Sequence, residues 1–227
     1  MADVLSSLRA PDGSVTIAGL HDDVQELPPA VRESWTALPF DAAAFLGGVG
    51  LSVPAGERDR PVLEQVWARP CFEVHGLGSG YLGEGFKSVI PAVAHAKVSF
   101  RLLPRRDPAR VHTAFRQHVE SRLPPDCRAA FTALGAAAPV AVPVDGVMLN
   151  PGLAGLRDEW GKAAIAGTGG SIPILAEFRD RLGMDALLVG FAQFDNRVHS
   201  PNEKYDLSIS VRGTGSWVRS LDRLARG

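Results

Sequence analysis

The 227-residue chain has few cysteines: Cys71 and Cys127 are the two, and they stand far apart. This spacing fits neither a disulfide framework nor a zinc-thiolate site, so we expect reduced thiols in a cytoplasmic protein. No apolar run is long enough to span a bilayer, and the first residues lack the apolar core of a signal peptide. The 24 basic and 25 acidic residues leave a net charge of -1, which does not favour nucleic acid or a membrane surface as partner. Small-molecule or protein partners are therefore expected.

Several catalytic signatures are also absent. There is no G-x-S-x-G nucleophile elbow, and the six histidines form neither an H-x-x-x-H pair nor an H-E-x-x-H motif. The pattern G-x-G-x-x-G does occur over residues 78–83, but Pro91 and a strand follow it instead of a helix. Arg101 stands near the position where a dinucleotide site would need an acid. We interpret these glycines as a connection between strands.

Hydrophobic residues make up 45% of the chain, enough for one large domain or two small ones. The clearest pattern is an alternation with period two over residues 92–103. One side carries Ala94, Ala96, Val98, Phe100 and Leu102, and the other carries His95, Lys97, Ser99 and Arg101. The alternation predicts a sheet with one apolar face and one polar, mostly cationic face on which Arg101 is accessible.

Helix signals surround this strand. Residues 2–9 are typical of a helix end before a turn, and helices are predicted over residues 29–38, 42–46 and 62–67. Asp107 and Pro108 begin another helix, whose apolar stripe is Val111, Ala114, Phe115 and Val119. With strands from Cys71 and over residues 128–134, the prediction is a strand, strand, helix, strand unit of the α+β sandwich type.

After a boundary near Val144 the pattern alternates between helix and strand. We predict helices over residues 150–161, 171–183 and 208–225, and strands ending at Ala166 and covering residues 186–189. The last helix is expected to bury Trp217, Leu221 and Leu224. The fold class is therefore α/β, with an α+β sandwich before residue 145 and an α/β part after it.

Two segments could carry chemistry. In G-T-G-G-S-I-P, from Gly167, a helix start after glycines could bind an anion, or it could be a plain turn with Ser171 as the N-cap. His199 follows a strand-like apolar run in polar surroundings. It could be a metal ligand or a solvated loop histidine. The residues by themselves leave both pairs of alternatives open.

Four segments together resemble one family. They are G-E-G-F-K-S-V-I-P from Gly83, K-V-S-F-R-L-L-P from Lys97, the glycine-rich segment from Gly167, and R-V-H-S-P-N-E-K-Y from Arg197. In this order, and with W-A-R-P at Trp67, they resemble the di-zinc metallopeptidases that include carnosinase-like dipeptidases, aminoacylases and glutamate carboxypeptidases. The similarity extends over nearly the whole chain.

The resemblance implies a role for particular residues. His199 would be the last zinc ligand, Arg101 a clamp for the substrate carboxylate, and Gly170 with Ser171 part of the substrate-binding loop. Ser88 stands where threonine is usual, and its hydroxyl would help to complete the partner subunit's site in a homodimer; the neighbouring Phe86 replaces a usual alanine. Residues 1–145 would be a lid or dimerisation domain, and residues 146–227 the C-terminal part of a catalytic domain that uses two zinc ions.

The chain also departs from the family pattern. The H-x-D metal motif, a bridging aspartate, the Glu-Glu pair with the general base, a further acidic ligand and a lid histidine are not found in it, nor are the first strand and helix of the lid. We therefore expect a truncated or split hydrolase of dipeptides or N-acyl amino acids. It would have no catalytic residue of its own and be inactive alone, with a separately encoded N-terminal half as one candidate partner. A non-catalytic dimerisation module is the alternative.

Overall fold

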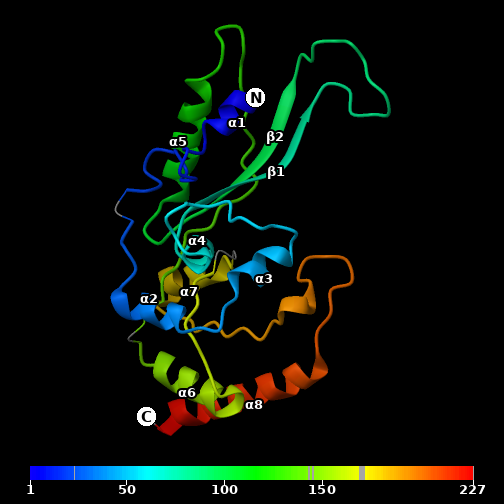
Figure 1. Ribbon diagram of the computed structural model, residues 1–227. Helices are drawn as coiled ribbons and strands as arrows, with labels where there is room; N and C mark the ends of the chain where they lie inside the picture. The colour runs from blue at the N-terminus through cyan, green and yellow to red at the C-terminus, as the bar shows by residue number, and fades with distance from the viewer. Residues whose placement is uncertain (23, 143, 145, 169–171, 227) are drawn as a thin grey trace. The chain divides into compact units, whose positions relative to one another are not determined.

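Figure 1 shows the computed structural model, which describes residues 1–22, 24–142, 144, 146–168 and 172–226. The chain forms two compact units. The first comprises Met1–Pro139 and Ala166–Pro173, and the second comprises Val140–Ile165 and Ile174–Gly227. Helices combine with a small antiparallel sheet, as the α/β prediction required. Among the described helices, none has both the length and the apolar character needed to cross a membrane.

The helices of the first unit lie within or close to the predicted ranges. They are α1 (Ala2–Ser6), α2 (Pro29–Thr36), α3 (Ala42–Gly47), α4 (Val62–Trp67) and α5 (Pro108–Glu120). The Asp41 carboxylate accepts hydrogen bonds from the backbone N–H groups of Ala43 and Ala44, and that of Asp107 accepts one from Ala109. These bonds satisfy N–H groups that have no partner inside a helix. The predicted starts of α3 and α5 are confirmed.

The sheet is a hairpin of β1 (Cys71–Ser79) and β2 (Ala94–Arg101), which run side by side in Figure 1. The strands are antiparallel, with Glu73 opposite Ser99 and Cys71 opposite Arg101. A bulge between Val74 and Gly76 leaves His75 as the extra residue of β1. The register therefore places Glu73 diagonally across from Arg101, within reach of a long side chain.

The apolar face of the hairpin covers the core of the first unit. Phe72 is buried with residues of the N-terminal segment and of α5, namely Leu8, Val15, Ile17, Leu20 and Val111. Val98, Phe100 and Leu102 of the predicted apolar face pack against this cluster. The ring of Phe100 lies between those of Phe72 and Phe115, with centroids 5.3 and 5.4 Å away. The alternation predicted for residues 92–103 is confirmed where the strand meets the core.

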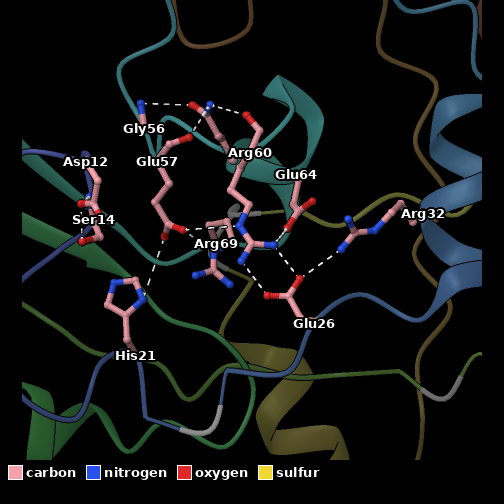
Figure 2. A network of polar contacts seen from close by, with 11 residues as sticks. Asp12, Ser14, His21, Glu26, Arg32, Gly56, Glu57, Arg60, Glu64 and Arg69 are labelled. Carbon is pink, nitrogen blue, oxygen red and sulfur yellow. Dashed lines mark hydrogen bonds and ion pairs between the residues drawn. The ribbon is translucent and has the colours of Figure 1, made fainter.

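A network of ion pairs connects the loops around α2 and α4 (Figure 2). The Arg60 guanidinium donates to both carboxylate oxygens of Glu26, at 2.6 Å each, and to Glu64 Oε1 at 2.9 Å. These hydrogen bonds lower the pKa of Glu26 to about 2. Arg69 Nε donates to Glu57 Oε2 at 2.8 Å. The network holds together a part of the chain that has little regular structure.

The predicted strand over residues 128–134 is wrong. This segment follows α5 without regular secondary structure, and its Phe131 ring packs edge-on against Phe115 at 6.0 Å. An apolar extended run becomes a strand only when its backbone groups pair with a neighbour. In the described part of the chain, the sheet has two strands and this segment does not join them. Phe131 packs in this way, but Leu134 is 85% exposed, so the apolar pattern does not correspond to a buried strand.

The second unit contains α6 (Leu149–Trp160), α7 (Ile174–Leu182), the short 3-10 helix η1 (Phe194–Asn196) and α8 (Leu207–Arg226). Gly161 ends α6 in the left-handed conformation, with φ of 76°, as predicted. The predicted strands ending at Ala166 and over residues 186–189 are wrong, because both segments are irregular. Leu188 is 46% exposed rather than buried.

The buried face of α8 also differs from the prediction. Trp217 and Leu221 are 41% and 57% exposed, whereas Gly213, Ser216 and Ser220 are buried. Small residues of α6 let the two helices approach closely: a Cβ added at Gly155 would lie 2.7 Å from the Ser220 nitrogen. Trp160 Nε1 donates to Ser216 Oγ at 2.7 Å. Close approach, this hydrogen bond and ion pairs from Arg212, Arg219 and Arg223 to acids of α6 join the two helices, while Trp217 and Leu221 stay largely exposed.

Candidate functional site

Arg101, the predicted carboxylate clamp, lies at the end of β2 and is paired with an acid of β1. Its Nε and Nη2 atoms both lie 3.3 Å from Glu73 Oε2. The two side chains are 39% and 35% exposed, so the pair is accessible from solvent. The polar face of β2 is mostly cationic, and β1 adds the Glu73 carboxylate to that same face.

Glu73 has further polar neighbours on the same face. Its Oε2 atom accepts a hydrogen bond from Ser99 Oγ at 3.0 Å, and His75 Nε2 lies 3.7 Å from it. His75 Nε2 is also 2.7 Å from Ser99 Oγ. A catalytic triad needs the carboxylate on the other ring nitrogen, where it orients the imidazole. Here serine and carboxylate share one nitrogen, so the cluster does not have the geometry of a nucleophilic site.

Glu73 and His75 were not among the predicted site residues, although their sequence pattern carries a signal. In C-F-E-V-H, Phe72 and Val74 alternate with polar residues, as the face of β1 that lies beside Arg101 requires. Cys71 lies on the same face of β1 as Glu73. Burial raises the pKa of its thiol, and the nearby Glu73 carboxylate adds to the shift. Cys71 is therefore a protonated thiol at neutral pH, not a nucleophile.

His199 lies on an exposed loop between η1 and α8. The backbone is left-handed at three non-glycine residues there, Arg197, His199 and Asn202, with φ of 53°, 62° and 61°. The His199 N–H donates to Glu203 Oε2 at 3.3 Å, and Lys204 pairs with Asp195. The hydrogen bond from Lys204 lowers the pKa of Asp195. Left-handed backbone is uncommon outside glycine, and its repetition shows that local contacts hold this loop in an unusual path.

The donors near His199 do not fit a complete zinc site. Zinc in proteins takes three or four protein ligands. Across the ranges that the structure describes, no three histidine, cysteine, aspartate or glutamate side chains converge on one point. His199 therefore offers a single imidazole, and the described residues of this chain do not hold zinc by themselves.

The other predicted site residues lie apart from this loop in the sequence. Ser88 is exposed in the connection between β1 and β2, where Lys87 Nζ lies 4.7 Å from the centre of the Tyr81 ring. Gly170 and Ser171 lie outside the described residues. Just before them, a Cβ added at Gly167 would lie 2.3 Å from the Trp67 carbonyl oxygen, so glycine is required there for close approach. Arg101 and His199 belong to different units.

The first unit contains a two-layer α+β domain, in which the β1–β2 hairpin packs against α5 and keeps its polar face exposed. The family model described as "Peptidase dimerisation domain" matches residues 1–127. The match covers more than half of the chain, and the chain therefore belongs to this family of M20 metallopeptidases. The predicted family membership is confirmed.

Known proteins are similar over almost the whole chain. The Cys-Gly metallodipeptidase of Schizosaccharomyces pombe is 26% identical over 226 residues, covering 98% of this chain and 48% of that protein. The Beta-Ala-His dipeptidase of Homo sapiens is 24% identical over 230 residues, covering 94% and 45%. The M20 family metallo-carboxypeptidase of Sulfolobus solfataricus superposes with a TM-score of 0.84 at 25% identity, covering 98% of this chain and 51% of that one. The chain spans about half the length of the relatives it matches.

Proposed function

We propose that this chain provides substrate-binding and dimer-forming parts of a metallopeptidase that hydrolyses dipeptides or N-acyl amino acids. The observation that carries the proposal is similarity to two kinds of dipeptidase over more than nine-tenths of the chain. Arg101 adds chemical support, because it lies on an accessible sheet face. These findings favour a hydrolase over the non-catalytic module considered as an alternative.

Arg101 is the residue to which we assign recognition of the substrate. A guanidinium presents parallel N–H groups that match the two oxygens of a carboxylate, and it stays charged at any physiological pH. Arg101 would hold the terminal carboxylate and so orient the amide bond to be cleaved. Gly170 and Ser171 would contribute to the same pocket, and Ser88 would reach the site of a partner subunit. These roles remain predictions.

Hydrolysis requires groups beyond those described in this chain. The family names of the relatives imply a metal cofactor, and zinc is the metal we propose, with His199 as one ligand. A single imidazole is too few donors for ordinary zinc affinity. We therefore propose that these 227 residues are inactive by themselves and that residues outside them would provide the other ligands. Cytoplasmic location likewise remains a prediction.

A dipeptidase assay tests the proposed dependence on other groups. The purified chain with added zinc is expected to show no hydrolysis of Cys-Gly or Beta-Ala-His. Turnover that disappears in His199→Ala would overturn the proposed inactivity while supporting His199 as a ligand.

Ligand binding tests the clamp independently of turnover. N-acetylglycine carries the carboxylate that Arg101 would bind, and N-acetylglycinamide is the analogue in which an uncharged amide replaces it. Loss of a charge-assisted hydrogen bond should weaken N-acetylglycine binding by roughly tenfold or more in Arg101→Gln, without changing the binding of the amide. Equal binding of N-acetylglycine to both proteins, measured by NMR titration, would refute the clamp.

We propose that the chain forms a homodimer through the first unit. The β1–β2 connection supports this, because Phe86 and Ile90 are 90% and 96% exposed there. Exposed apolar side chains of this size commonly mark contact surfaces. The double substitution Phe86→Ser and Ile90→Ser should convert the dimer to monomer in sedimentation velocity. A dimer of undiminished affinity in that variant would place the contact elsewhere.

A further inference from the structure

The Arg101 guanidinium already has a carboxylate partner inside its own chain. Both the Nε and Nη2 atoms are 3.3 Å from Glu73 Oε2. These two atoms form one of the paired N–H edges with which arginine binds carboxylates. A ligand carboxylate approaching that edge would meet Glu73 first.

The pair is built loosely. Charge-assisted N–H···O bonds are usually about 2.7–2.9 Å long, and a two-pronged pair uses both carboxylate oxygens. Here both donors converge on one oxygen at a longer distance, and both side chains are more than one-third exposed. Exposed ion pairs of this kind contribute little to stability. A ligand that offers two oxygens can therefore replace Glu73.

Glu73 would keep other partners after leaving Arg101. Ser99 Oγ donates to its Oε2 atom at 3.0 Å, and His75 Nε2 lies 3.7 Å away. The bulge at His75 adds that residue to β1 beside Glu73. Displacement therefore does not leave a carboxylate without polar neighbours, which would be costly in a partly buried position.

We propose that Glu73 is an internal competitor for Arg101 and so sets the affinity of the site for carboxylate ligands. The proposal rests on the function proposed for Arg101. It makes Glu73 a specificity-determining residue: a ligand binds only when its carboxylate pairs with Arg101 better than Glu73 does. Neutral ligands gain nothing at this position.

The substitution Glu73→Gln tests the competition. Glutamine keeps the size of the side chain and an oxygen that can accept from Ser99, but it removes the charge. Binding of N-acetylglycine, followed by NMR titration of the full chain at constant pH and ionic strength, should tighten about threefold to tenfold. Binding of N-acetylglycinamide should not change. Glu84→Gln is the matched control, because Glu84 is an exposed acid of the β1–β2 connection, and it should change neither ligand's binding.

The double variant Glu73→Gln with Arg101→Gln separates this proposal from the function it rests on. It should lose the preference for the acid over the amide. If Arg101→Gln removes that preference but Glu73→Gln leaves it unchanged or weakens it, the competition is refuted and the clamp remains. If no variant prefers the acid, or if the preference survives without Arg101, both fail. Unchanged amide hydrogen exchange in β1 and β2 verifies that each variant is folded.

Discussion

Gly13 occupies a turn at which two segments of the first unit touch. Its φ is 91°, and a Cβ added there would lie 2.2 Å from the Gly56 carbonyl oxygen and 2.8 Å from its carbon. The Arg58 N–H donates to the Asp12 carbonyl oxygen at 2.8 Å and joins the same two segments. All these atoms belong to the backbone, so no side-chain rotation can relieve the contact.

Gly13→Ala should therefore be strongly destabilising. A left-handed conformation costs a residue with a Cβ about 1–2 kcal/mol, and forcing an extra methyl group into a packed contact costs about 1–3 kcal/mol. The sum is about 2–5 kcal/mol. Gly50 provides the matched control, because its φ is 77° and nothing lies within 4 Å of an added Cβ. Gly50→Ala should lose only the first contribution, about 1–2 kcal/mol.

Amide hydrogen exchange in β1 and α5 is the assay, because it reports on the first unit alone. Urea denaturation followed by tryptophan fluorescence is a second measurement; Trp35 and Trp67 pack edge to face in this unit, with ring centroids 5.0 Å apart. If the two variants lose the same stability within about 0.5 kcal/mol, the close approach to Gly56 is not energetically significant and the reasoning is refuted.

Two further predictions concern α5 and acid stability. Asp107→Ala removes the cap of α5 and should cost about 1 kcal/mol in urea denaturation, whereas Asp126→Ala, in an exposed loop, should not; equal midpoints for the two variants would contradict the cap. Burial lowers the pKa of His21 and of His118, so the unfolded chain binds protons more readily than the folded chain near pH 6.5. Their contribution to stability is fully present above about pH 6.5 and is lost as the pH falls through the lowered folded-state values. The double substitution His21→Gln and His118→Gln should reduce the fall in urea midpoint between about pH 7.5 and 5.5, and an unchanged fall would refute this assignment.

Short-range signals predicted much of the first unit. Asp41 and Asp107 begin helices because a carboxylate directly before a helix meets N–H groups that need a partner. The alternation in residues 92–103 predicted which side chains of β2 face the core, and Val98 and Phe100 do so. These features depend on neighbours a few residues away, which the sequence displays directly.

Predictions that required a distant partner were less successful. Residues 128–134 and 186–189 have apolar patterns typical of strands, but an isolated extended segment is not a strand until another backbone pairs with it. In α8, the exposed Trp217 is larger than the buried Ser216, which accepts a hydrogen bond from Trp160 of α6. Side-chain size could not predict that face, because it depends on the glycines of the facing helix.

The sequence by itself determined the family and the capped helices, because motif order and local capping signals carry that information. Arg101 as a clamp for the substrate carboxylate remains a prediction. Only the tertiary structure decided that the Glu73 carboxylate pairs with the Arg101 guanidinium. That contact depends on the register between β1 and β2, with Glu73 opposite Ser99 and a bulge at His75. Register is a property of two strands together, so neither strand's residues reveal it separately.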